Sequence, residues 1–213
     1  SIPFLGLTNE GMPRFYNERG VETLGDFNFS SSNINFLKYS GTLDPTDVGT
    51  LTNTFRYKNF TLSANINYEF GAVTRLRSIS NTDDYSAFPR ELTQRWKKPG
   101  DEAHTNIPRI PTSYAFDQYG ADNLINGFYA YSASTARIVS TDLVRLKEIS
   151  MEYTVSKTLL RRTPLKNLAV KLQAQNLMLL YSDARLRGDD PAYMYSSSVT
   201  APKKLILTLR VGL

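Results

Sequence analysis

The 213-residue chain contains no cysteine, so disulfide frameworks and thiolate metal sites are excluded. It has one histidine, His104, and neither a phosphate-binding glycine loop nor a paired metal-ligand spacing. We therefore predict that it is not an enzyme and needs no cofactor. No apolar run approaches the roughly 20 residues of a transmembrane helix. The chain starts at Ser1 without an apolar signal segment, from which we expect a processed start or a fragment.

Clustered charge is also scarce. The net charge is +5, but the basic residues are scattered except at Lys97-Lys98, Arg161-Arg162 and Lys203-Lys204. Scattered lysine and arginine are typical of a solvated surface, so we do not expect a nucleic-acid partner. Asp189 and Asp190 could offer oxygen ligands to Ca²⁺. Acidic pairs are common in surface loops, so we treat these two residues as weak candidates and predict no metal site.

What the chain does contain is strict alternation of apolar and polar residues. Between positions 60 and 71 one phase is apolar: Phe60, Leu62, Ala64, Ile66, Tyr68 and Phe70. Successive strand side chains point to opposite faces, so this segment predicts a two-faced strand. Eleven residues span roughly 36 Å, or about 25 Å when tilted about 45°, which matches the apolar band of an outer-membrane barrel. Soluble strands average only about five or six residues.

Four more segments alternate in the same way, at about 49–57, 141–155, 166–178 and 203–213. Lys58-Asn59 separates the first two strands and predicts a tight hairpin, where asparagine tolerates a left-handed conformation. Between Leu146 and Ile149 the apolar phase slips by one residue. This slip predicts a β-bulge at Lys147-Glu148.

The connections differ strongly in length. Segments 58–59 and 156–165 are short, whereas 72–139 and 179–202 are long, rich in Pro, Gly, Asp, Ser and Tyr, and without sustained periodicity. Outer-membrane barrels have short periplasmic turns and long extracellular loops. We therefore predict that both short turns and the C-terminus face the periplasm, and that the long loops face outside.

The charged strand residues Arg56, Glu69, Lys171 and Arg210 fall in the polar phase. The polar residues expected to face a barrel lumen are Arg56, Asn65, Asn67, Glu69, Lys171, Gln173 and Arg210. A basic side chain turned to lipid at the midplane would cost about 2–4 kcal/mol. Aromatic residues near the strand ends resemble two girdles: Tyr57, Phe60 and Tyr153 at one side, Tyr68 and Phe70 at the other.

A soluble β-sandwich also alternates apolar and polar residues. A secreted β-sandwich binding module therefore remains the alternative to a transport barrel, and a non-transporting structural barrel is a more remote one. Five strands cannot close a barrel with a lumen, since the smallest use about eight. Other strands must complete a membrane barrel.

Several blocks, in this order, resemble the C-terminal region of SusC/RagA-like TonB-dependent transporters. They are FLGLTNEGMPRFYNERG (4–20), the strand-hairpin block 37–71, RWKKPGDEAHTNIPR (95–109), STDLVRLKEISMEYTVSKTLL (140–160), LKNLAVKLQAQNLMLL (165–180) and DDPAY (189–193). Ala192 stands where the family usually has Glu, and the chain ends in Leu213 where the family usually ends in Phe.

The resemblance implies an all-β fold: a transmembrane antiparallel β-barrel segment with long extracellular loops, the last five strands of a 22-stranded barrel. The plug domain and earlier strands would lie outside this chain. The implied partners are the remainder of the barrel, the plug, a SusD-like surface lipoprotein, TonB through the absent N-terminal region, and the lipid bilayer. The implied role is import of oligosaccharides or peptides across the bacterial outer membrane.

Aromatic residues gather in the long connections: Tyr114, Phe116, Tyr119, Phe128, Tyr129, Tyr131, Tyr193 and Tyr195. Such rings suit a sugar or a partner interface, because they combine a large contact area with a polar edge. We favour packing of the loops or contact with a lid over direct substrate binding.

Overall fold

The computed structural model describes residues 1–76, 90–187, 189–193 and 201–213. The chain forms two compact units. The first combines residues 1–41 with 74–139, and the second combines 42–73 with 140–213. Among the described residues, no helix is long and apolar enough to cross a membrane.

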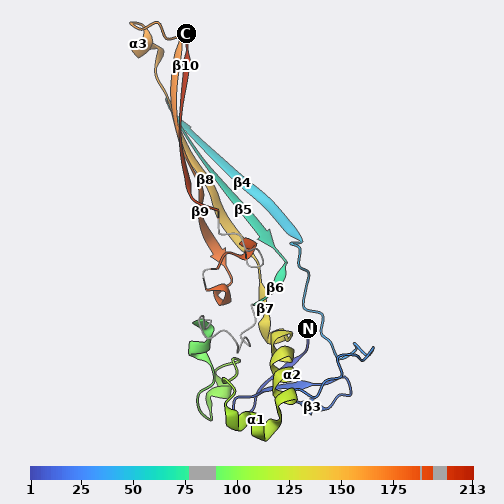
Figure 1. The fold of residues 1–213 in the computed structure, drawn as a ribbon. Helices are drawn as coiled ribbons and strands as arrows, with labels where there is room; N and C mark the ends of the chain where they lie inside the picture. Colours follow the sequence, from blue (N-terminus) through green and yellow to red (C-terminus); the bar gives the residue numbers. More distant parts are fainter. Residues whose placement is uncertain (77–89, 188, 194–200) are drawn as a thin grey trace. The chain divides into compact units, whose positions relative to one another are not determined.

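The second unit is a five-stranded antiparallel sheet with strand order β10-β9-β8-β5-β4 (Figure 1). Its strands are β4 (Asp47–Tyr57), β5 (Phe60–Phe70), β8 (Leu143–Thr154), β9 (Asn167–Ser182) and β10 (Lys204–Gly212). Each lies at one of the five positions predicted from alternation. The fourth continues to Ser182, into a segment predicted as loop. All five exceed the usual length of about five or six residues.

The pairing of β5 with β8 shows the irregularity that the sequence predicts, whereas the register shifts between β8 and β9 were not predicted. Asn65 pairs with Glu148 and Ile66 with Leu146, so Lys147 is the extra residue and the predicted bulge is confirmed. The predicted hairpin turn joins β4 to β5, but its left-handed residue is Lys58, with φ of 53°, and not the asparagine.

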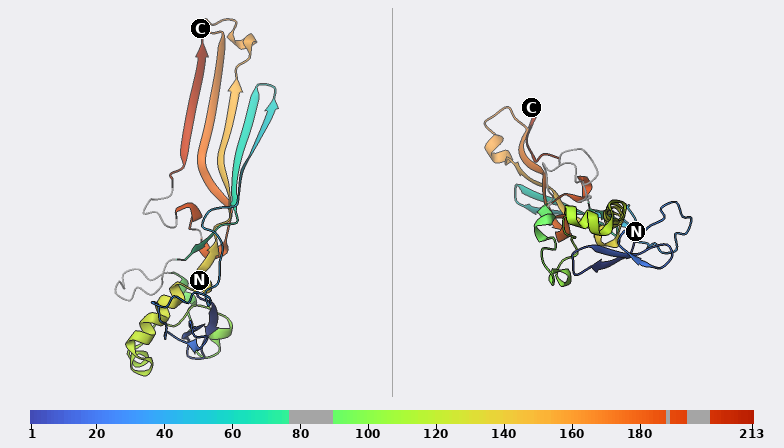
Figure 2. Two further views of the ribbon diagram at one scale, coloured as in Figure 1. Left: turned by 90° about the vertical axis from the view of Figure 1, so that its right-hand side faces the viewer. Right: turned by 60° about the horizontal axis from the view of Figure 1, so that its bottom comes forward.

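Both short connections lie at the same end of this sheet as the C-terminus (Figure 2). The backbone N–H of Thr154 donates to the carbonyl of Asn59 at 2.9 Å, and that of Lys166 donates to the carbonyl of Gly212 at 2.8 Å. The second connection is more than a turn, because it contains the short helix α3 (Lys157–Leu160).

The first unit differs from the prediction. It contains the antiparallel sheet β1-β2-β3, the helices α1 and α2, and three short 3₁₀ helices. The bounds are β1 (Phe4–Leu7), β2 (Pro13–Tyr16), β3 (Glu22–Thr23), η1 (Arg90–Gln94), η2 (Asp101–Ala103), α1 (Ser113–Tyr119), α2 (Ala121–Ser132) and η3 (Thr135–Arg137). Two further strands, β6 (Val73–Arg75) and β7 (Ile138–Ser140), pair with each other. For the described part of 72–139, the expectation of a loop without sustained periodicity was wrong. Thr112 caps α1, and the buried residues of α2 recur at helical spacing along one side of that helix.

Aromatic packing holds the first unit together. The Phe4 ring lies 5.9 Å from that of Phe15 and 5.7 Å from that of Tyr131, and Phe27 lies 5.9 Å from Phe15. Burial of such a side chain stabilises the fold by about 1.5–3 kcal/mol. A second cluster contains Met12, Ala115, Leu124 and Phe128, and so joins both helices to the N-terminal segment.

A buried ion pair adds a long-range tie within this unit. Arg137, only 2% exposed, donates to both carboxylate oxygens of Glu91 at 2.7 and 2.8 Å. The guanidinium also lies 5.6 Å from the ring of Tyr131. Burial raises the pKa of Tyr131 to about 12.

Candidate functional site

The register of the sheet sorts its side chains onto two chemically different faces. One row of directly opposed residues crosses all five strands and is apolar: Phe55, Leu62, Met151, Leu172 and Leu207. The next row along the strands faces the other way and is polar: Arg56, Thr61, Glu152, Lys171 and Thr208. The bulge at Lys147 keeps Val144 and Leu146 on the same face as Ile149, Met151 and Tyr153.

The apolar face is exposed. Leu207 keeps 71% of its surface accessible, and other large apolar residues of this face are similarly open: Leu51, Phe55, Tyr57, Met151, Met178, Leu205 and Leu209. A contiguous apolar surface of this kind marks contact with a membrane or another protein. Aromatic rings gather at each end, with Phe60 4.7 Å from Tyr153 and Tyr68 5.5 Å from Phe70. Asn53, opposite Ala64, is a polar exception on this face.

The polar face carries side-chain contacts between its strands. Gln175 donates to Glu148 at 3.1 Å and Asn65 donates to Thr52 at 3.1 Å, both between neighbouring strands, whereas the ion pair of Arg210 with Glu152, at 3.3 Å, crosses β9. The predicted lumen-facing residues share this face: Arg56, Asn65, Asn67, Glu69, Lys171, Gln173 and Arg210. Exposed ion pairs contribute about 0–1 kcal/mol to the free energy of folding, so the pairs on this face add little stability. The exposed polar side chains are suited to contact with water.

The segment after β9 is tied to this polar face. Arg145, opposite Asn67, lies 2.6 Å from the Asp190 carboxylate, which also accepts the Ala192 backbone N–H at 3.1 Å. The segment contains η4 (Ala184–Leu186) and η5 (Pro191–Tyr193). Asp190 is therefore already occupied by an arginine. Within the described ranges, no group of three His, Cys, Asp or Glu residues could hold a metal ion. Sequence reasoning missed the Arg145–Asp190 pair.

The predicted aromatic residues divide into two groups. Tyr131 and Phe128 are buried in the first unit, and Tyr119 donates its hydroxyl to Glu10. Burial, with the Glu10 hydrogen bond, raises the pKa of Tyr119 to about 12. By contrast, Tyr114 is 71% exposed and Tyr129 is 62% exposed. Two more keep part of their surface accessible, Phe116 and Tyr193. Tyr195 lies outside the described residues.

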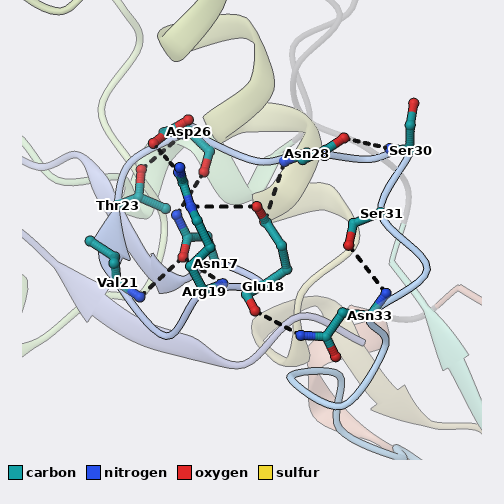
Figure 3. Close-up of polar contacts among 10 residues, drawn as sticks. All are labelled: Asn17, Glu18, Arg19, Val21, Thr23, Asp26, Asn28, Ser30, Ser31 and Asn33. Atoms are coloured by element: carbon teal, nitrogen blue, oxygen red, sulfur yellow. Dashed lines mark hydrogen bonds and ion pairs between the residues drawn. The ribbon is translucent and has the colours of Figure 1, made fainter.

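A polar loop follows β2 and satisfies its own hydrogen-bonding groups (Figure 3). Buried Asn17 accepts from the N–H of Arg19 and Val21, both at 3.0 Å, and donates to the Asp26 carbonyl at 3.0 Å. Asn33 donates to the Glu18 carbonyl at 2.8 Å. These internal contacts make the loop a structural element of the first unit.

A second ordered loop, 95–109, packs against the N-terminal segment. The indole of Trp96 donates to Glu102 at 2.9 Å, and its backbone N–H donates to Ile107 at 2.9 Å. Gly11, with φ of 77°, lies under the indole: a Cβ there would lie 2.4 Å from Trp96 Cδ2. The loop is thereby fixed in one position within its unit.

No protein-family model matches the chain, and no curated protein matches it in sequence. Solved structures do match. The RagAB peptide importer in its open-open state has a TM-score of 0.64 at 15% identity, covering 100% of this chain and 22% of that chain. The closed-closed state gives 0.63 at 16% identity, with 99% and 22% covered. The RagAB peptide transporter gives 0.57 at 17% identity, with 85% and 18% covered. The chain thus shares its fold with part of these importers and spans about a fifth of their chains.

Proposed function

We propose that this chain is the C-terminal part of a TonB-dependent nutrient importer of the bacterial outer membrane, and that its five strands form part of the barrel wall. The observation that carries the proposal is the exposed apolar face backed by a polar, hydrogen-bonded face. Lipid accepts backbone polar groups only where they are paired, in helices or closed barrels. The outer edges of β4 and β10 would then pair with strands outside this chain.

The soluble β-sandwich accounts for less of the structure. A sandwich covers the apolar face of each sheet with a second sheet about 10 Å away. The described part of the second unit supplies one sheet of five strands. Its apolar face is left to another molecule or to lipid.

The likeness to the RagAB importers supports the remaining assignments. We infer a 22-stranded barrel with a plug, a SusD-like surface lipoprotein as partner, TonB as the energy source, and oligosaccharides or peptides as substrates. The long connections would face outside and the two short ones the periplasm. Exposed Tyr114, Phe116 and Tyr129 are the residues best placed for lid or substrate contact. Tyr193 is a lesser candidate.

Fractionation and surface labelling test the proposal in the full-length protein. The protein should sediment with outer membranes and require detergent for extraction. This chain has no cysteine of its own, so Lys58→Cys and Ala192→Cys, both at exposed positions, each add its only thiol, and the unsubstituted full-length protein gives the background labelling. A membrane-impermeant maleimide should label Ala192→Cys on intact cells and Lys58→Cys only after the outer membrane is opened. A soluble protein, or the inverse labelling pattern, would contradict the proposal.

A further inference from the structure

Arg109 forms no ion pair with an acidic residue in the described part of the chain. Its Nε atom is buried and has no hydrogen-bond partner, and its guanidinium makes no hydrogen bond or ion pair with any described residue. Arg14 provides a comparison within the same unit. Its Nε is also buried without a partner, but its Nη1 lies 3.2 Å from Glu22. Arg137 likewise binds a carboxylate, that of Glu91. Arg109 is partly buried, as Arg14 is, but has no carboxylate partner among the described residues.

The position of Arg109 is fixed before any ligand arrives. Its backbone N–H donates to the Gly11 carbonyl at 3.1 Å, and the preceding Pro108 is fully buried. It ends the ordered loop held by Trp96. A binding group held in place in this way loses little conformational entropy when it binds.

The charge of Arg109 acts on the phenol of Tyr119, whose hydroxyl donates to Glu10. With a pKa of about 12, Tyr119 remains protonated at neutral pH and keeps the Glu10 carboxylate engaged. Tyr114, 71% exposed, and Ile110, 40% exposed, offer a phenol and an aliphatic surface in the same segment.

We propose that Arg109 binds the carboxylate of a ligand of the importer, with Tyr114 and Ile110 flanking the ligand. The planar guanidinium matches the two oxygens of a carboxylate. A phosphate dianion fits less well, because the site has one cation and an acid, Glu10, nearby. A carboxylate can come from a peptide or from a uronic acid sugar. A role of Arg109 in uptake rests on the proposed function, whereas binding of a carboxylate by Arg109 does not depend on it.

The test uses purified full-length protein and two matched pairs of probes. They are N-acetyl-trialanine with its C-terminal amide, and a glucuronic acid disaccharide with its neutral glucose counterpart. Phenylglyoxal modification mapped by mass spectrometry reports on each arginine. At saturation, one of the acids should slow modification of Arg109 about tenfold, while exposed Arg161 is unaffected. The acid that protects identifies the source of the carboxylate.

Calorimetry on variants gives the second readout. Arg109→Gln should weaken binding of the protecting acid about 10- to 100-fold, to the level of its uncharged counterpart. Lys97→Gln removes the same charge from an exposed position of the same loop and should leave binding unchanged. Equal binding of the acid and its neutral counterpart, or no protection of Arg109 by either acid, would overturn the proposal. Both of these measurements use the wild-type protein, so they remain valid if a variant fails to fold. Failure of membrane fractionation with acid binding intact would refute the proposed function alone.

Discussion

Arginine at two adjacent positions of β10 should have opposite consequences for assembly. Leu207 lies on the apolar face opposite Leu172, near the middle of the strand, and Ile206 lies on the polar face opposite Gln173. The original side chains have the same composition, so Leu207→Arg and Ile206→Arg change hydrophobicity and charge almost equally. Only the face differs.

The magnitude follows from the structure. At Leu207 an arginine near the midplane of the bilayer costs about 2–4 kcal/mol. The lost contact of leucine with lipid adds about 1–2 kcal/mol for a side chain that is 71% exposed. The total of about 3–6 kcal/mol is a large fraction of a typical folding free energy of about 5–15 kcal/mol. At Ile206, 37% exposed beside polar neighbours, we expect about 1 kcal/mol or less.

The assay is the fraction of full-length protein in the outer membrane that migrates as a folded, heat-modifiable band. Leu207→Arg should lose most of this band, and Ile206→Arg should retain it. Leu207→Ala separates the lost side chain from the added charge and should assemble. If the apolar face were in contact with water, the order would reverse, because the replacement of Leu207 by arginine would then cost little. Assembly of Leu207→Arg at or above the level of Ile206→Arg would therefore refute the membrane assignment of the apolar face.

Three further predictions concern single features of the two units. Deletion of Ser150, a regularly paired residue of β8, should abolish the folded band, because the residues of β8 before it would exchange faces, whereas deletion of Lys147 should be tolerated better, because it removes the extra residue of the bulge and leaves Leu146 and Ile149 on one face. Arg137→Ala should destabilise the first unit by about 3–5 kcal/mol, because the Glu91 carboxylate is left buried without its partner. Arg185→Ala removes an exposed ion pair and should cost about 1 kcal/mol or less. Protease resistance of the full-length protein measures both, and equal effects would contradict a stabilising role for the buried Arg137–Glu91 pair. Gly11→Ala should lower the melting temperature more than Gly20→Ala, because both have positive φ but only the first meets the single tryptophan of the chain; equal shifts would exclude the clash.

The strands and the bulge could be predicted because both depend on a short-range pattern. A period of two fixes the face of every residue without knowledge of the partner strand, and a slip of one residue, as at Lys147, leaves a visible break. Ion pairs between residues far apart in the sequence could not be predicted in this way. Arg145 and Asp190 lie 45 residues apart, and nothing local to either residue indicates their ion pair.

Helix α2 was missed because its sequence argues locally against a helix. Gly127 lies in its interior, where glycine costs about 1 kcal/mol relative to alanine. The structure shows why glycine stands there: a Cβ would lie 2.7 Å from the Leu24 carbonyl oxygen. Gly25 is similarly constrained, since its Cβ would meet the Asn123 carbonyl oxygen at 1.9 Å. Close packing of α2 on the N-terminal segment therefore required residues that weaken the helical signal.

The missed helix also explains why the aromatic residues could not be sorted. Tyr129 and Tyr131 are chemically identical and two positions apart, but one is 62% exposed and the other 1% exposed. On a strand, two positions would place both on the same face; on a helix they are about 200° apart. Leu124, Phe128 and Tyr131 follow the helical spacing and define the buried side. The period of the segment, more than the identity of its residues, decides which tyrosine packs the first unit and which is free to meet a partner.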